Sequence, residues 1–146
     1  MKNHILITSR LKLVPFTVED EALFLSLNQD AFIRKYLWDD EVISQETSAE
    51  ILRENQSLFK ANGYGLWKIM PLESEKVIGY AGLWYFFGEP QPQLIYTLLK
   101  SYTKRGYATE AGKTVIRYAF ENLGFTYLIA ATDESHMASQ AVAKRL

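Results

Sequence analysis

A strand-like segment, a short basic turn and a helical segment follow one another without a break at residues 98–111. Leu98 and Leu99 end the apolar segment, and Gly106 stands in the turn before the helix. Glycine lets the backbone bend tightly and approach a ligand closely, because it has no Cβ atom. A second strand-like segment, 125–131, follows the helix. Strand, helix and strand in this order predict a βαβ unit whose strands are parallel and joined by a right-handed crossover.

The turn itself has the features of an anion-binding site. Lys104 and Arg105 place positive charge there, and Ala108 keeps the first helical turn thin. The N–H groups of that turn have no partners within the helix, and the helix dipole adds partial positive charge at the same end. We therefore expect the backbone N–H groups from Lys104 to Thr109 to bind a pyrophosphate. The alternative is an ordinary strand-to-helix turn whose basic residues are merely solvated.

Apolar periodicity and turn residues predict the other elements. Thr17 is placed to cap the first helix, either Ser44 or Thr47 caps the third, and Gly124 ends the helix of the βαβ unit. The three strands before that helix are expected to form an antiparallel meander. The predicted strands are 11–14, 66–70, 76–86, 93–99 and 125–131, and the predicted helices are 18–28, 31–36, one after residue 44, 107–123 and one over the last residues.

Composition narrows the class of protein. A chain of 146 residues with 48% hydrophobic and 14% aromatic content predicts one globular domain with a sizeable core. A net charge of −1 gives no global field for nucleic acid, so we expect no nucleic-acid partner. The chain has no cysteine and only two histidines, His4 and His136, which argues against a disulfide framework and a metal site. The N-terminus lacks the pattern of a signal peptide and the apolar tracts are short, so we expect a cytoplasmic protein without a membrane segment.

Two segments carry a resemblance to a known family. Residues 104–111, Lys-Arg-Gly-Tyr-Ala-Thr-Glu-Ala, closely resemble the acetyl-CoA loop of the GCN5-related N-acetyltransferases, the GNAT superfamily. Residues 8–16, followed by Glu19 and Asp20, are similar to the opening strand and first helix of the RimJ/RimL-like subgroup that acetylates ribosomal-protein N-termini. The resemblance implies an α/β (α+β) fold, with a mixed, mostly antiparallel sheet, a central splayed parallel pair and flanking helices. The resemblance also implies that residues 1–146 form a single acetyltransferase domain without the family's C-terminal strands.

The resemblance also implies the reaction. Acetyl would pass from acetyl-CoA to a primary amine by direct attack in a ternary complex, with the acceptor left open between a protein N-terminus, a polyamine and an aminoglycoside-like molecule. The Leu98 backbone N–H would stabilise the oxyanion, and Ser139 would protonate the departing thiolate, although a helix serine facing a cap or solvent is the alternative. The residues implied in cofactor binding are Leu98, Leu99, Lys104, Arg105, Gly106, Tyr107, Ala108, Thr109 and His136.

Roles for single side chains are left open at three places. His136 replaces an asparagine that often contacts the cofactor in relatives, and an ordinary surface histidine is the alternative. For Tyr107 we favour packing of the ring on the sheet over stacking on the cofactor. No general base is assigned, because Gln93 stands where the family often has glutamate. Carboxylates that could accept a proton through water, or be solvated loop residues, are Glu89, Asp133 and those of Asp39 to Glu41.

Other departures affect the turn and the acceptor channel. Thr103 and Lys104 replace the usual Trp-Gly before the turn, which is compatible with pyrophosphate binding if the φ angle of Lys104 is negative. Ile95 replaces a small glycine on the splayed strand and is expected to narrow the channel.

Two other classes of function are alternatives to the acetyltransferase hypothesis. Gln93 and the missing closing strands also suit a non-catalytic CoA-binding or self-associating remnant, and a homodimer would then complete the sheet. A nucleotide-binding protein is disfavoured, because the chain has no Gly-x-x-x-x-Gly-Lys-Ser/Thr loop.

Overall fold

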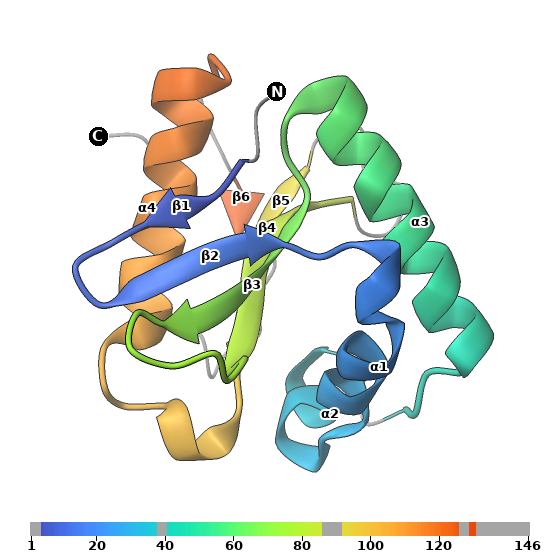
Figure 1. Ribbon diagram of the computed structural model, residues 1–146. Helices are drawn as coiled ribbons and strands as arrows, with labels where there is room; N and C mark the ends of the chain where they lie inside the picture. Colours follow the sequence, from blue (N-terminus) through green and yellow to red (C-terminus); the bar gives the residue numbers. More distant parts are fainter. Residues whose placement is uncertain (1–3, 38–40, 86–91, 126–128, 131–146) are drawn as a thin grey trace.

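The strands form one sheet in the order of the chain, β1-β2-β3-β4-β5-β6, in the computed structural model (Figure 1). The structure describes residues 4–37, 41–85, 92–125 and 129–130. Neighbouring strands from β1 to β5 are antiparallel, and β5 and β6 are parallel. The strands are β1 (Leu6–Ile7), β2 (Leu11–Pro15), β3 (Leu66–Pro71), β4 (Gly79–Trp84), β5 (Gln93–Leu98) and β6 (Ile129–Ala130).

The βαβ unit is present and consists of β5, helix α4 (Tyr107–Asn122) and β6. The parallel pairing joins Gln93 to Ile129 and Leu94 to Ala130. This parallel pair lies at one edge of the described sheet, because strands β1 to β4 all lie on the other side of β5. The prediction of a central parallel pair is therefore wrong for the described residues. Strand divergence beyond Ala130 would fall outside the described residues.

Helices cover both faces of the sheet. Helix α4 lies against one face, and α1, α2 and α3 lie on the other side (Figure 1). Side chains of β3, β4 and β5 alternate between two apolar clusters, since successive residues of a strand point to opposite faces. In β3, for example, Trp67 and Ile69 belong to the cluster that includes Ala111 and Val115 of α4, whereas Leu66 belongs to the other. The helices on the second side are α1 (Glu21–Gln29), α2 (Ala31–Leu37) and α3 (Gln45–Asn62).

Local signals explain where the helices begin and end. The Ser44 hydroxyl accepts a hydrogen bond from the Thr47 N–H at 3.0 Å, so Ser44 is the cap of α3. The first predicted helix is divided into a 3₁₀ turn, η1 (Val18–Asp20), and α1. Asp20 holds this turn, because its carboxylate accepts the Thr17 N–H at 2.9 Å and pairs with Lys68 of β3 at 2.9 Å.

Several predicted boundaries are wrong. Strand β1 was not expected, because two residues are too short to show alternation. Strand β4 begins three residues later than predicted, at Gly79, and β6 begins after the predicted start. Phe125 lies outside β6 because its N–H turns back to the Ala119 carbonyl at 3.0 Å, next to Gly124 with a φ of 76°. Helix α4 ends at Asn122, one residue early.

A buried asparagine connects α3 to the sheet. Asn55 has no exposed surface, and its Oδ1 accepts the Leu66 N–H at 2.7 Å. Its Nδ2 donates to the Phe16 carbonyl at 3.1 Å and to the Leu66 carbonyl at 3.2 Å. The side chain therefore satisfies backbone groups where β2 ends and β3 begins, which fixes α3 over this end of the sheet.

Candidate functional site

The turn between β5 and α4 bends at Gly106, where the sequence predicts a tight bend. Gly106 has a φ of 81° and is the N-cap of α4. It has no side chain to cap the helix, and the first bond of the helix is from the Glu110 N–H to the Gly106 carbonyl at 3.0 Å. The N–H groups from Tyr107 to Thr109 therefore precede the helical ladder and have no acceptor within it.

Lys104 also has a positive φ, 64°, so the condition of a negative φ that was set for this residue is not met. The 3₁₀ turn η2 (Lys100–Tyr102) closes with the Thr103 N–H bonded to the Lys100 carbonyl at 3.1 Å. The chain must then reverse within a few residues to begin α4, and left-handed conformations at Lys104 and Gly106 accomplish this reversal. A side chain with a Cβ is strained in this region, and glycine is not.

Replacing Lys104 measures that strain. Lys104→Gly and Lys104→Ala both remove the charged side chain, and they differ only in the Cβ atom. We expect the glycine variant to unfold with a free energy about 1 kcal/mol higher than that of the alanine variant, because only alanine keeps the left-handed strain. Urea denaturation of the two variants checks this. Equal stability, or a more stable alanine variant, would show that the backbone is not strained here.

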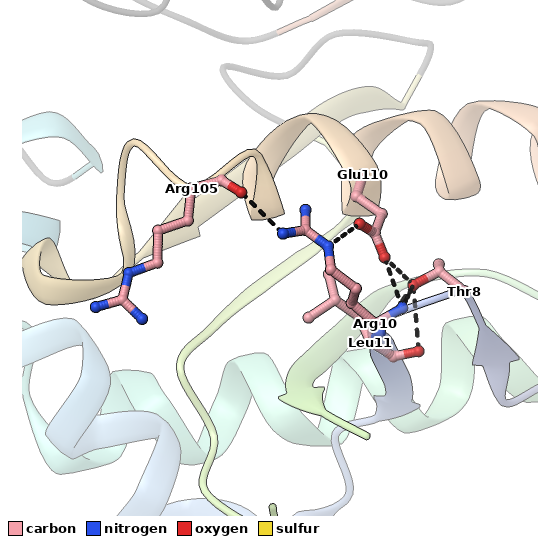
Figure 2. Close-up of polar contacts among 5 residues, drawn as sticks. All are labelled: Thr8, Arg10, Leu11, Arg105 and Glu110. Carbon is pink, nitrogen blue, oxygen red and sulfur yellow. Dashed lines mark hydrogen bonds and ion pairs between the residues drawn. The ribbon is translucent and has the colours of Figure 1, made fainter. Parts of the chain in front are cut away.

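The basic side chains of the turn are exposed. Lys104 and Arg105 both face solvent. The Arg105 guanidinium lies over the ring of Tyr102, with Cζ 5.4 Å from its centroid, and the Lys76 Nζ lies 5.4 Å from the same centroid. In Figure 2 the Arg105 side chain extends away from Arg10. The turn therefore has an unobstructed positive surface, in the part of the chain that the structure describes.

Arg10, from the bend between β1 and β2, binds the same turn. Its Nη1 donates to the Arg105 carbonyl at 3.0 Å, and its Nε donates to the Glu110 Oε1 at 2.7 Å (Figure 2). Its Cζ lies 4.5 Å from the centroid of the Tyr107 ring. The other Glu110 oxygen accepts the Arg10 N–H at 3.1 Å and the Thr8 hydroxyl. This Thr8–Arg10–Glu110 network joins the start of β2 to the first turns of α4.

The network changes the ionisation of Glu110. Burial favours the neutral acid, but hydrogen bonds from Thr8 and Arg10, together with the Arg10 charge, lower the pKa of the Glu110 carboxyl below its ordinary value of 4.5. A lowered pKa in the folded state means that the ionised form stabilises the fold. This stabilisation is complete above the ordinary pKa and is lost as the pH falls through the lowered value.

The pH dependence of Glu110→Gln tests this sign. We expect wild type to exceed the variant in unfolding free energy by a constant amount above about pH 5.5, and the difference to shrink below about pH 4.5. Urea denaturation across this range measures it, with the exposed Glu54→Gln of α3 as the matched control. A difference that is independent of pH, or that grows in acid, would contradict the account.

The other predicted residues of the turn occupy a small region. Tyr107 is half-buried and packs against the cluster that includes Ala111 and Val115 of α4. Ala108 is also partly buried there, and Thr109 is exposed.

Leu98 and Leu99 differ in the direction and the hydrogen-bond partners of their backbone groups. The Leu99 N–H donates to the Ile78 carbonyl at 2.8 Å, and its carbonyl accepts the Tyr102 N–H at 2.9 Å. Both groups thus have partners within the chain. Backbone groups of a strand alternate in direction, so the Leu98 N–H faces away from β4, toward the β6 side.

Several predicted residues lie outside the described part of the chain, namely Ser139, His136, Asp133, Glu89, Asp39 and Asp40. Of the remaining candidates, Glu41 is exposed in the segment before α3, and Gln93 is in β5, paired with Trp84 and Ile129. Ile95 is buried in the second cluster.

Two kinds of feature are absent from the described residues. No group of three histidine, cysteine or acidic side chains is placed to hold a metal ion. None of the helices is both long enough and apolar enough to cross a membrane.

Sequence reasoning did not identify Arg10 and Glu110 as members of the site. Both residues stand within the segments that carry the family resemblance, but they are 100 positions apart. Their opposite charges within the two matched segments are the available signal, and only the fold shows that they meet.

Comparison with known proteins identifies the family. A family model described as an acetyltransferase (GNAT) domain matches residues 10–146. The chain therefore belongs to the GNAT family, which confirms the resemblance, and it is an acetyl-CoA-dependent N-acetyltransferase.

Individual relatives are distant. The uncharacterized N-acetyltransferase YnaD of Bacillus subtilis (strain 168) is 22% identical over 95% of this chain and 79% of its own length. The acetyltransferase of Agrobacterium tumefaciens str. C58 has a TM-score of 0.78 at 22% identity, over 94% of this chain and 79% of that one. RimL, a ribosomal L7/L12 alpha-N-protein acetyltransferase solved in complex with CoA, has a TM-score of 0.73 at 18% identity, over 94% and 80%. At these identities the structural likeness shows the fold.

Proposed function

We propose that the turn from Lys104 to Thr109 binds the pyrophosphate of acetyl-CoA and that the protein transfers the acetyl group to a primary amine. The observation that carries the proposal is the uncapped start of α4, where Gly106 provides no side chain to occupy the first N–H groups. An anion placed there receives several backbone hydrogen bonds and the positive end of the helix dipole. Lys104 and Arg105, both exposed, add charge of the right sign.

The acetyl end of the cofactor is proposed to lie beside the end of β5. The Leu98 N–H faces the β6 side, and a backbone N–H directed at the thioester oxygen would stabilise the oxyanion that forms when an amine attacks. This role requires β5 and β6 to diverge beyond their two paired positions, which we infer from the family. Leu98 itself is 3% exposed, so its side chain fixes the strand end in the core.

The remaining chemistry is assigned by the resemblance. Ser139 is proposed to protonate the departing thiolate, and His136 to contact the cofactor. Deprotonation of the amine is left to water and a carboxylate that we do not name, since Gln93 cannot serve as a carboxylate base.

The acceptor is proposed to be a protein N-terminus or a small-molecule amine. The name of RimL, which has the same fold, describes an acetyltransferase of a ribosomal-protein α-amine, and this supports the first choice. Ile95, a buried residue of β5, is proposed to narrow the acceptor channel. A narrow channel favours an unbranched amine over an aminoglycoside.

An acceptor screen tests the proposal. Purified protein is incubated with acetyl-CoA and three acceptor sets, namely peptides with free N-termini, polyamines and aminoglycosides, while released thiol and product mass are followed. We expect turnover with one of these amine classes and none with an N-blocked version of the same acceptor. Binding of acetyl-CoA without transfer to any amine would support the non-catalytic remnant instead.

A homodimer that completes the sheet and the extent of the domain both stay predictions. Light scattering on the same sample tests the first of them. A stable monomer would count against the dimer.

A further inference from the structure

We infer that Arg10 is a positioning residue of the acetyl-CoA site: it orients the Arg105–Gly106 peptide so that the Gly106 N–H faces the pyrophosphate. This inference rests on the proposed function of the turn. Arg10 belongs to the bend before β2 and not to the turn, and its guanidinium reaches the turn from outside (Figure 2).

The geometry of one peptide unit carries the argument. A trans peptide is planar, and its C=O and N–H point in opposite directions. The Arg105 carbonyl accepts a hydrogen bond from the Arg10 Nη1 at 3.0 Å, so it points toward Arg10. The Gly106 N–H must therefore point to the opposite side of the turn, which the guanidinium leaves open. Without Arg10 this peptide can rotate, because Gly106 restricts its own backbone less than any other residue would.

The guanidinium is itself held in place. The Glu110 carboxylate accepts its Nε at 2.7 Å, and the Tyr107 ring lies under its Cζ at 4.5 Å. An arginine has donors in a rigid planar fork, so one side chain can bind the carbonyl and the carboxylate at the same time. A lysine donates all its hydrogen bonds from one nitrogen and lacks the spaced, planar donors of the guanidinium, so we expect that it does not reproduce this bridge.

The same contacts control a negative charge near the anion site. Glu110 lies in the first turns of α4, where an unpaired carboxylate would compete with a phosphate for the helix terminus. Its two oxygens instead accept hydrogen bonds from Arg10 and Thr8 on the side of β2. Arg10 thus neutralises Glu110 and directs it away from the open side of the turn.

Arg10→Lys and Arg10→Gln test the inference, with Lys68→Gln as the matched control. Lys68 also forms a partly buried ion pair, with Asp20 at 2.9 Å, but on α1's side of the sheet. Acetyl-CoA binding is measured by calorimetry, and S-acetylpantetheine, which lacks the pyrophosphate, is measured by NMR titration. The amide resonance of Gly106 is recorded in each protein without ligand.

We expect both Arg10 variants to bind acetyl-CoA at least about tenfold more weakly, because a loss of this size is typical when a charge-assisted hydrogen bond is removed. Their affinity for S-acetylpantetheine should equal that of wild type, and KM for acetyl-CoA should rise while kcat holds. The Gly106 resonance should shift in both variants and not in Lys68→Gln.

Wild-type affinity in Arg10→Lys would overturn the inference, because charge alone would then suffice. An equal loss for both ligands would also overturn it, by showing general damage to the fold. If wild type itself fails to bind acetyl-CoA, the proposed function fails. The ligand-free Gly106 resonance separates these cases, since it reports the orientation of the peptide whether or not CoA binds.

Discussion

Gly106→Glu is expected to abolish acetyl-CoA binding while most of the fold survives. The new carboxylate would stand at the start of α4, where the pyrophosphate is proposed to bind. Two like charges about 4 Å apart repel by about 4 kcal/mol at the effective dielectric of a protein surface, which weakens binding roughly a thousandfold. The Cβ atom would also lie 3.2 Å from the Arg10 Nη2, so the Thr8–Arg10–Glu110 network must shift.

Gly124→Glu is the matched control for this variant. Gly124 has a φ of 76°, close to the 81° of Gly106, and a Cβ there meets no atom within 4 Å. Both variants thus add the same charge and a left-handed strain of about 1–2 kcal/mol, but only one lies at the turn. Calorimetry with acetyl-CoA should show unchanged affinity for Gly124→Glu. Unchanged affinity in Gly106→Glu would remove the turn from the site.

Asn55→Ala is expected to cause the largest loss of stability. The substitution removes three hydrogen bonds and leaves a cavity between α3 and the sheet. The Leu66 carbonyl keeps a partner, because it also accepts the Phe16 N–H at 3.1 Å, but the buried Leu66 N–H loses its acceptor. Burying an unsatisfied group costs about 1–3 kcal/mol, and with the cavity we expect a total loss of about 3 kcal/mol.

Urea denaturation measures this loss, and Gln56→Ala is the control. Gln56 is exposed on the same helix, so its replacement should change the unfolding free energy by less than about 0.5 kcal/mol. A loss below about 1 kcal/mol in Asn55→Ala would show that water or backbone movement satisfies the Leu66 N–H.

The order of the elements could be predicted from the sequence because its signals are local. Ser44 marks the start of α3, and the period of apolar residues separates the helices from the meander. The edge position of the parallel pair and the existence of β1 could not be predicted in the same way. Both depend on which strands pair across the sheet, and the pattern of a single strand does not encode its neighbours.

The candidate site shows the same difference between features with a local sequence signal and features that depend on distant residues. Gly106 identified the turn, because a glycine between a strand-like and a helical segment allows the tight bend that is found there. The sign of φ at Lys104 could not be predicted, since it depends on the path that the chain must take from η2 to α4. Arg10 and Glu110 meet only because the fold places the start of β2 next to the start of α4. Residues 100 positions apart in the sequence give no periodic signal.

The central claim is that the start of α4 holds the pyrophosphate of acetyl-CoA. An NMR titration of the ¹⁵N-labelled protein with acetyl-CoA tests it most directly, because amide resonances report hydrogen bonds to individual N–H groups. The account predicts that the amides of Gly106, Tyr107, Ala108 and Thr109 shift the most, and that those of α3 stay in place. Binding that leaves these four amides unchanged would contradict the account and place the cofactor elsewhere.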